Sequence, residues 1–385
     1  MNQSKQISVA MIGLAFGGLF APIYAAHPNV ERVILVDRDP ERMETALYLT
    51  RNFRHKVEVY NSFEDVLRDR SIDAVHICTG IPGHGEMSVS VLDAGKHCAC
   101  AVPMAISLED IRRVVEAARR SGKNYMMMET EIYEAAFLYA RGMLERGELG
   151  RIQFMRGIHH QCMDFGDWNT QTRHYWRGMP PMWYISHALS PLRVAAGSRI
   201  REVVCFGSGT MDEEKVKNYG NPYPAEDMLV RFENGLAAEV SRMMHECSVK
   251  QTESYNIYGS KKSFMYEYRH EVWEQFYDET KYDRVGFHTD VIDYPNRYDL
   301  LPEEIQRFTI EGGADSENWK ELLDTAPLSM HSGSHPHLVH EFVSSILENR
   351  KSAMDEDLSA NITAAGICAH TSAMNGGRLE TVPEF

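Results

Sequence analysis

The sequence predicts an α/β protein with two domains: a doubly wound parallel sheet, then an α+β domain with a mainly antiparallel, open sheet. Three observations support this prediction. An apolar run at residues 7–12 breaks into a glycine turn at residues 13–18. Short apolar segments then alternate with helix-length segments as far as residue 130, which is typical of a parallel sheet. Farther on, strands follow one another directly, with the hairpin signal Asn234-Gly235 between two of them.

The glycine turn predicts a dinucleotide-binding site. A strand, turn and helix in this order direct backbone N–H groups and the positive end of the helix at a pyrophosphate. Gly13 is expected to form the tight turn and Gly18 to let the helix and strand pack closely, while Ala15 replaces the middle glycine of the pattern. The second strand ends at Asp37, where a carboxylate would bind the adenosine ribose. The cofactor residues predicted at these turns are Gly13, Ala15, Phe16, Gly17, Gly18, Asp37 and Arg38.

The cofactor is predicted to be NAD. A carboxylate at Asp37 accepts hydrogen bonds from the ribose hydroxyls and repels the 2′-phosphate of NADP. Arg38 is the alternative, since a guanidinium beside that position could hold the phosphate.

The rest of the first domain is predicted as alternating elements. Ser62 and Ser107 stand where N-caps belong, each followed three residues later by an aspartate. We expect helices at 40–52, 62–68, 84–94 and 107–121 and strands at 57–60, 73–78, 95–103 and 124–128. Because ligands of parallel sheets bind at the carboxyl ends of the strands, Thr79, His84 and Pro103 are expected to contact the cofactor. This dinucleotide-binding Rossmann domain is expected to span residues 1–130.

Residues 131–385 are expected to form a substrate-binding domain that also mediates self-association. We predict helices at 134–146, 336–349 and 361–374 and strands at 152–158, 203–207, 228–232, 236–243 and 253–258. The charged, aromatic stretch from Tyr266 to Asp324 shows no clear pattern. A long run of strands needs covering on both faces, which favours a homo-oligomer of two or more chains.

Composition and charge exclude several functions. The 385 residues carry a net charge of -15, which repels nucleic acid. No apolar run approaches the length needed to cross a bilayer, and the first residues do not resemble a secretory signal. Seven cysteines without paired metal-ligand spacing indicate free thiols and a reducing, cytoplasmic compartment.

Two segments of the second domain are candidate substrate contacts. Flat aromatic faces beside hydrogen-bonding groups suit sugar rings, which points to Trp176, Arg177, Trp183 and Tyr184; an aromatic core or subunit interface is the alternative. Four histidines and a glutamate lie within residues 331–341. A proline-broken loop rarely holds three rigid metal ligands, so we expect no metal there. Ser334 and His335 are instead expected to face sugar hydroxyls, with a solvated loop before a helix as the alternative.

The sequence resembles the glucose–fructose oxidoreductase/inositol dehydrogenase (Gfo/Idh/MocA) family over nearly its full length. The glycine turn with Asp37 carries the resemblance, together with segments 78–84, 95–103 and 144–150. The resemblance implies that the turn before His84 lies along the cofactor and that the segment ending at Pro103 adjoins the nicotinamide.

The chain departs from the family at two positions. Members usually have Glu-Lys before that proline, and the lysine helps to shuttle the proton of the oxidised hydroxyl; here Ala101 and Val102 cannot titrate. Members also tend to have an aspartate four residues before an active-site histidine, whereas this chain has Trp183 before His187. Some other group must therefore take the hydroxyl proton.

His187 matches the family's active-site histidine and is the first candidate for the general base, since an imidazole titrates near neutral pH. A structural histidine is the alternative. Tyr133 and Glu131 follow the last strand of the first domain and should face the cleft. Each is a candidate proton relay, or only a contact or rim residue.

The function implied by the resemblance is oxidation of a sugar hydroxyl by hydride transfer to NAD. Val-Pro at 102–103 and His-x-Leu-x-Pro at 187–191 resemble two enzyme types. These are bacterial glycoside 3-dehydrogenases and NAD-dependent α-N-acetylgalactosaminidases, and both begin by removing hydride from C3. We expect oxidation at C3 of a glycoside. Two alternatives remain: an NAD-retaining glycoside hydrolase, and an inactive cofactor-binding regulatory protein, which the loss of the lysine permits.

Overall fold

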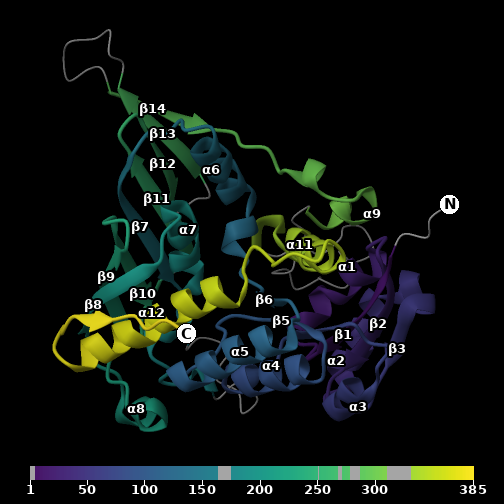
Figure 1. Ribbon diagram of the computed structural model, residues 1–385. Helices are drawn as coiled ribbons and strands as arrows, with labels where there is room; N and C mark the ends of the chain where they lie inside the picture. Colours follow the sequence, from purple (N-terminus) through teal and green to yellow (C-terminus); the bar gives the residue numbers. More distant parts are fainter. Residues whose placement is uncertain (1–4, 164–174, 250, 268–270, 278–286, 310–330) are drawn as a thin grey trace.

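The computed structural model describes residues 5–163, 175–249, 251–267, 271–277, 287–309 and 331–385. Within these residues the chain forms two sheets that lie side by side, each with helices against it (Figure 1). One sheet belongs to the N-terminal part of the chain and the other to the C-terminal part. The predicted fold class is confirmed.

The N-terminal sheet has six parallel strands in the order β3-β2-β1-β4-β5-β6. The order reverses between β1 and β4, which creates the crevice in which ligands of doubly wound sheets bind. The strands are β1 (Ile7–Ile12), β2 (Val30–Val36), β3 (Val57–Val59), β4 (Ala74–Ile77), β5 (His97–Cys100) and β6 (Tyr125–Met127). Nearly all their residues are buried, as expected for a parallel sheet covered on both faces.

Helices α1 to α5 connect these strands, and their bounds are α1 (Ala21–Ala26), α2 (Pro40–Leu49), α3 (Phe63–Arg68), α4 (His84–Asp93) and α5 (Leu108–Ser121). The two serine N-caps form as predicted: Ser62 Oγ accepts from the Asp65 N–H at 3.1 Å, and Ser107 Oγ from the Asp110 N–H at 3.0 Å. Helix α2 ends at Leu49 rather than at residue 52, because a 3₁₀ helix follows at Arg51–Lys56.

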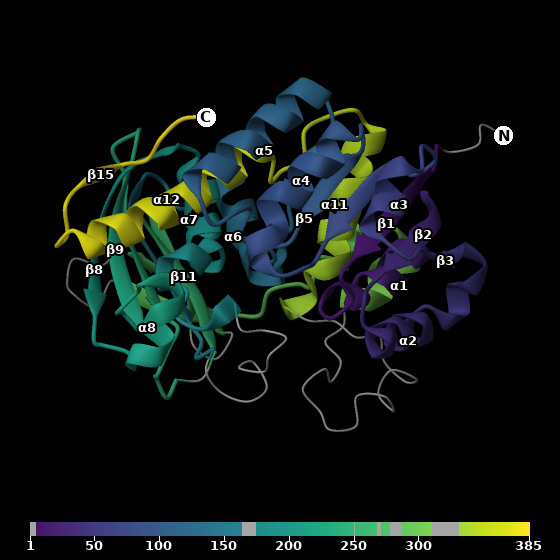
Figure 2. The same cartoon turned by 90° about the horizontal axis from the view of Figure 1, so that it is seen from below.

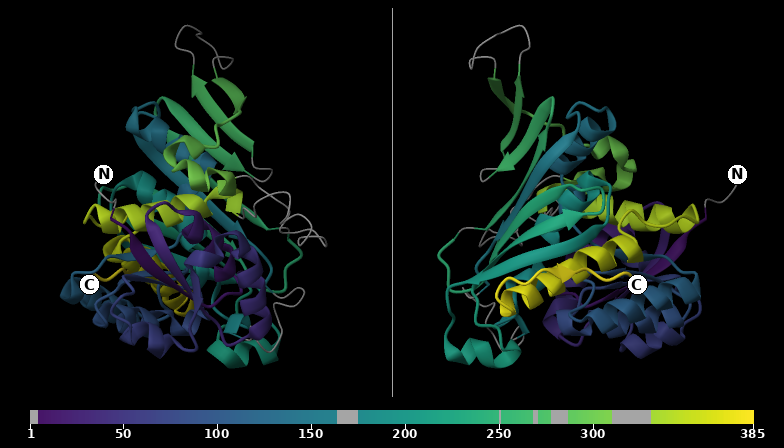
Figure 3. Two further views of the ribbon diagram at one scale, coloured as in Figure 1. Left: turned by 90° about the vertical axis from the view of Figure 1, so that its right-hand side faces the viewer. Right: turned by 60° about the vertical axis from the view of Figure 1, so that its left-hand side comes forward.

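The C-terminal sheet has nine strands in the order β14-β13-β12-β11-β7-β10-β9-β8-β15. Neighbours pair antiparallel except for β7 and β10, which are parallel. The strands are β7 (Ile152–His160), β8 (Ile200–Ser208), β9 (Ala225–Phe232), β10 (Ala237–Met243), β11 (Thr252–Gly259), β12 (Lys262–Glu267), β13 (Glu271–Tyr277), β14 (Phe287–Ile292) and β15 (Glu380–Thr381). Strands β12 to β15 were not predicted from the sequence, and β13 and β14 extend the sheet at the end far from the Rossmann domain (Figure 3).

Helices between the two sheets join the halves of the molecule (Figure 2). These are α6 (Ala135–Glu145), α7 (Ser186–Ala196) and α12 (Glu356–Met374), whereas α8 (Glu213–Tyr219) lies at the edge. Helix α12 begins at Glu356, earlier than predicted, because the Asp355 carboxylate caps it by accepting from the Leu358 N–H at 2.9 Å. Helix α11 (His335–Leu347) packs against α1, so this late segment of the chain returns to the Rossmann domain before β15 rejoins the second sheet. A short α9 (Glu303–Gln306) precedes it.

The nine-stranded sheet exposes apolar side chains on strands β8 and β9, where Phe206 is 62% and Leu229 is 55% exposed. The helices described are all too short or too polar to cross a lipid bilayer. The seven cysteines, all within the described residues, form no disulfide.

Candidate active site

The glycine turn after β1 is shaped by two close backbone approaches to Cys78. Gly13 has a φ of +87°, and a Cβ built there would lie 2.5 Å from the carbonyl oxygen of Cys78. A Cβ on Gly17 would lie 2.8 Å from the Cβ of Cys78. On Gly18 it would meet only Ala46, at an ordinary 3.9 Å. The close approach assigned to Gly18 therefore belongs to Gly17, and the exposed Ala15 stands at the open side of the turn.

Asp37 connects the ends of β1 and β2. Its carboxylate accepts hydrogen bonds from the backbone N–H of Leu14 at 2.6 Å and from that of Asp39 at 2.9 Å. The half-buried carboxylate is thereby fixed beside the glycine turn, while Arg38 is exposed. A tight turn with three glycines next to an oriented carboxylate fits the pyrophosphate and adenosine ribose of a dinucleotide.

His84 fastens the turn after β4 to the segment after β5. Its Nδ1 lies 2.8 Å from the carbonyl oxygen of Pro103 and its Nε2 lies 3.2 Å from that of Thr79. Both ring nitrogens are thus occupied within the protein. His84 holds the two segments together, and Thr79 and Pro103 follow the carboxyl ends of β4 and β5.

A buried carboxylate–imidazole pair stands where the two domains meet. Glu129 follows β6, and its Oε1 accepts from Nδ1 of His187, near the start of α7, at 2.7 Å. The carboxylate is fully buried and the imidazole is 5% exposed. Burial acts to lower the pKa of His187, but the charge and hydrogen bond of Glu129 outweigh it and raise this pKa to about 9.

Three further carboxyl groups surround the pair, from Glu131, Glu134 and Glu253. One carboxylate oxygen of Glu131, one of Glu253 and one ring nitrogen of His187 all lie within 4.8 Å of one another. Burial first, and then the negative charges of Glu134 and Glu253, raise the pKa of Glu131 well above its ordinary value. Burial likewise raises the pKa of Glu134 to about 8. The raised pKa values of Glu131 and Glu134 favour the neutral form of both carboxyl groups, because burial penalises the charged form.

Aromatic and basic side chains line one side of the pair. The Tyr184 hydroxyl lies 3.3 Å from Nε2 of His187, and the ring of Trp176 packs edge-on against Tyr184 at 4.9 Å. His159 packs edge-on against His187 at 5.0 Å, and its Nε2 lies 3.2 Å from Glu253. The guanidinium of the fully buried Arg242 lies over the Tyr184 ring. Of the predicted substrate contacts, Trp176 and Tyr184 are therefore brought to His187.

The segment before α11 connects the pair to the glycine turn. His331 stacks on His187 with 6.1 Å between ring centroids and meets Phe16 edge-on at 5.6 Å. His335 stacks on Phe20 at 4.2 Å, and Ser334 is buried beside it. The other histidines of the cluster point elsewhere, since His337 stacks on Tyr133 and His340 bonds to His27. The described residues therefore do not gather this cluster into a metal site.

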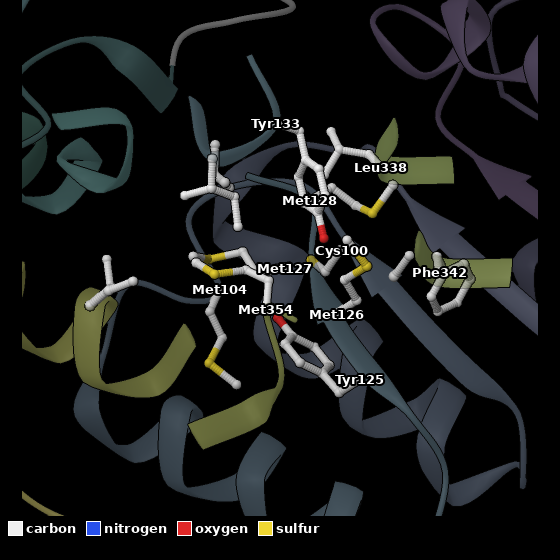
Figure 4. Close-up of a cluster of buried hydrophobic side chains, with 14 of the residues drawn as sticks. Cys100, Met104, Tyr125, Met126, Met127, Met128, Tyr133, Leu338, Phe342 and Met354 are labelled. Atoms are coloured by element: carbon white, nitrogen blue, oxygen red, sulfur yellow. The ribbon is translucent and has the colours of Figure 1, made fainter. Parts of the chain in front are cut away.

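Three predicted site residues lie away from His187. Tyr133 belongs to a hydrophobic cluster with Met128, Leu338 and Phe342 (Figure 4), and the charges that affect the pKa of its hydroxyl, after burial itself, are those of Glu341, Arg141 and Arg350. Arg177 pairs with Glu214 on α8 at 2.8 Å. Trp183 lies against the rings of Tyr219 and His370.

Two important residues were not predicted. Glu129 directly follows a buried strand at the carboxyl edge of the sheet, which is a signal that the sequence offered. Glu253 lies on β11, and the sequence did not show that its carboxylate meets His187, because the two belong to different elements far apart in the chain.

Comparison with known proteins identifies the family. Residues 7–129 match the family model described as oxidoreductase family, NAD-binding Rossmann fold, and residues 137–265 match the Gfo/Idh/MocA C-terminal domain. The chain belongs to the Gfo/Idh/MocA family of oxidoreductases. As predicted, its cofactor is NAD.

Similar members of the family have names that refer to sugars and polyols. A glycosyl hydrolase family 109 protein 1 of Phocaeicola vulgatus is 24% identical over 87% of this chain and 84% of its own length. An inositol 2-dehydrogenase of Salmonella paratyphi B is 24% identical over 37% of this chain and 42% of its own. The solved structure of a levoglucosan dehydrogenase with NADH and levoglucosan has a TM-score of 0.76, with 20% identity over 99% of this chain and 100% of that one.

Proposed function

We propose that this Gfo/Idh/MocA protein oxidises the C3 hydroxyl of a glycoside, with NAD as hydride acceptor. The observation that carries the proposal is the buried Glu129–His187 pair at the carboxyl edge of the NAD-binding sheet. The pair supplies a group that can transfer protons in a chain that lacks the family's lysine. Ala101 and Val102 offer no titratable side chain, and Val102 is only 9% exposed.

The roles of the residues follow from their geometry. The bound NAD supplies the hydride acceptor, held at the glycine turn and Asp37. Glu129 fixes the proton on Nδ1 of His187, which leaves Nε2 as the atom that exchanges a proton with the substrate hydroxyl. Tyr184 holds Nε2 in place through its hydroxyl, and Trp176 beside it presents an aromatic face to a sugar ring.

The pKa of about 9 for His187 sets the direction of pH dependence. Below that pH the imidazole is protonated and can donate to a carbonyl, which favours reduction. The neutral form that accepts the hydroxyl proton grows as the pH rises towards 9, which favours oxidation. The pair therefore serves both halves of a reversible hydride transfer.

The second candidate is a glycoside hydrolase that oxidises C3 transiently and then reduces it again with the same NAD. The similarity to the glycosyl hydrolase family 109 protein supports this candidate, because it extends over 87% of the chain. An inactive cofactor-binding regulatory protein is the third, and its only support is the loss of the lysine.

A panel of glycosides distinguishes the three candidates when NADH absorbance and the masses of the products are both recorded. We expect NADH to accumulate with a 3-keto product. Free sugar without net NADH would identify the hydrolase, and NAD binding without turnover of any sugar would identify the regulator. Titration of both cofactors should show NAD binding more tightly than NADP, because of Asp37; tighter NADP binding would show that Arg38 dominates.

We also propose that the chain self-associates through the face of the large sheet that exposes Phe206 and Leu229. Light scattering should give at least twice the chain mass of 44.0 kDa at micromolar protein. A cytoplasmic location, expected from the free thiols, remains a prediction.

A further inference from the structure

Helix α11 lies beside α1, the helix that follows the glycine turn, although the two are more than 300 residues apart in the chain (Figure 1). His335, the first residue of α11, stacks on Phe20 and meets Phe16 edge-on at 5.4 Å. Phe16 and Phe20 belong to the turn and helix that receive the pyrophosphate. The start of α11 is therefore a neighbour of the cofactor site.

Polar side-chain atoms at this helix end have no hydrogen-bond partner among the described residues. They are Oγ of Ser334 and both ring nitrogens of His335, and both residues are 0% exposed. A neutral imidazole always carries one N–H, so His335 leaves at least one donor unsatisfied. Buried polar atoms of this kind are normally satisfied, and their number here indicates a missing ligand.

The backbone of the same helix end is also available to an anion. Helix α11 has thirteen residues, and Ser334 at its N-cap position makes no side-chain capping bond. The first N–H groups and the positive end of the helix dipole thus lie uncapped next to the unpaired side chains. Gly333, with a φ of +79°, fixes this start, since a Cβ there would lie 2.5 Å from the carbonyl oxygen of Thr309.

The start of α11 lies between the glycine turn and His187, and this position indicates which part of the cofactor it would contact. His331, just before α11, touches both Phe16 of the turn and the ring of His187. A dinucleotide with its pyrophosphate at the turn and its nicotinamide near His187 must pass this segment with its nicotinamide-side phosphate and ribose. Phosphate oxygens and ribose hydroxyls can form hydrogen bonds with the Ser334 hydroxyl and the His335 ring nitrogens.

We propose that Ser334, His335 and the first turn of α11 bind the nicotinamide-side phosphate and ribose of NAD. This replaces the expectation that Ser334 and His335 face sugar hydroxyls. The cofactor is then held by the glycine turn of one end of the chain and by a helix from the other.

The test is cofactor binding without any sugar, so that its result is independent of the proposed substrate. His335→Phe keeps a flat ring on Phe20 and removes both nitrogens, and Ser334→Ala removes the hydroxyl. Each variant should weaken NAD binding by about 10- to 100-fold in calorimetric titration, the usual effect of losing a hydrogen bond to a charged group. His340→Ala is the matched control, because His340 bonds to His27 and should leave NAD affinity unchanged.

Two further measurements separate binding from folding. Adenosine monophosphate reaches only the adenosine half of the site, so its affinity should be the same in wild type and in His335→Phe. The melting temperature of the NAD-free variant should equal or exceed that of wild type, because unpaired buried nitrogens have been replaced by an apolar ring. Unchanged NAD affinity in both variants, or equal losses for NAD and adenosine monophosphate, would overturn the proposal.

Discussion

Two glutamate–histidine pairs within the described part of the chain have nearly the same short contact. Glu129 and His187 are joined at 2.7 Å where the domains meet, and Glu226 on β9 and His370 on α12 are joined at 2.6 Å within the second domain. Both carboxylates are fully buried. Hydrogen-bond length and burial alone do not distinguish them.

The surroundings of the two glutamate–histidine pairs distinguish them. In the second-domain pair, the other carboxylate oxygen of Glu226 accepts from the backbone N–H of Met182 at 2.9 Å, so both oxygens are satisfied. The corresponding oxygen of Glu129 has no partner among the described residues, and more carboxyl groups lie beyond it. A satisfied pair holds elements together, whereas a pair with an unsatisfied carboxylate oxygen retains the capacity to exchange protons.

Removing the two histidines should give the largest contrast. His187→Ala should lower kcat by about a hundred- to ten-thousand-fold, the usual loss for a positioned base, while NAD affinity stays near that of wild type. His370→Ala should leave kcat near wild type and destabilise the protein by about 3–5 kcal/mol, because the buried Glu226 loses its partner. Steady-state kinetics and denaturant unfolding measure the two effects. A His187→Ala enzyme with normal kcat and only a raised KM would refute the proton-transfer role.

Replacing the carboxylate should alter the pH dependence of the oxidation rate at the Glu129–His187 pair and not at the Glu226–His370 pair. In wild type the rate of oxidation should rise as the pH approaches the His187 pKa of about 9. Glu129→Gln removes the charge that raises this pKa, so burial should lower it below the ordinary 6.5 and move the rise in rate to lower pH. Glu226→Gln is the control and should keep the wild-type pH profile. If both variants shift the profile alike, Glu129 acts through overall structure.

A smaller contrast is expected from the aromatic neighbours of the pairs, Tyr184 beside His187 and Trp183 beside His370. Tyr184→Phe should lower kcat by about two- to tenfold, the equivalent of one ordinary hydrogen bond. Trp183→Phe should lower the melting temperature and leave kcat nearly unchanged. An effect of Trp183→Phe on KM for the sugar would instead restore the sequence-based prediction that it contacts substrate.

The smallest effect is expected from chelation. Burial and neighbouring carboxylates raise the pKa of Glu131 and favour its neutral form, which is a poor metal ligand. Dialysis against a chelator should therefore leave kcat unchanged. Elemental analysis of the purified protein provides the check. Loss of activity on chelation, with recovery on adding Zn²⁺ or Mn²⁺, would show that Glu131, His187 and Glu253 hold a metal ion.

The sequence by itself determined the architecture of the first domain and the identity of the cofactor. Its signals there are local, because a buried parallel strand must be apolar throughout and a serine N-cap lies within one turn of the residue that it caps. The ribose-binding role predicted for Asp37 likewise depends only on its place at the end of a strand. Strands β13 and β14 lie in a segment rich in charged residues that carries no such local signal, so they were not predicted.

Only the tertiary structure decided which candidate residues form the site. Glu129 pairs with a histidine 58 positions away on another domain, and no local pattern encodes that distance. Tyr133, next to Glu131 and Glu134 in the sequence, turns into a hydrophobic cluster, while Glu131 faces His187. Ser334 and His335 were expected to face sugar hydroxyls, and only the packing of α11 shows that His335 contacts Phe16 and Phe20. The sequence determines which chemical groups the side chains carry, whereas the contacts of those groups depend on which elements pack together.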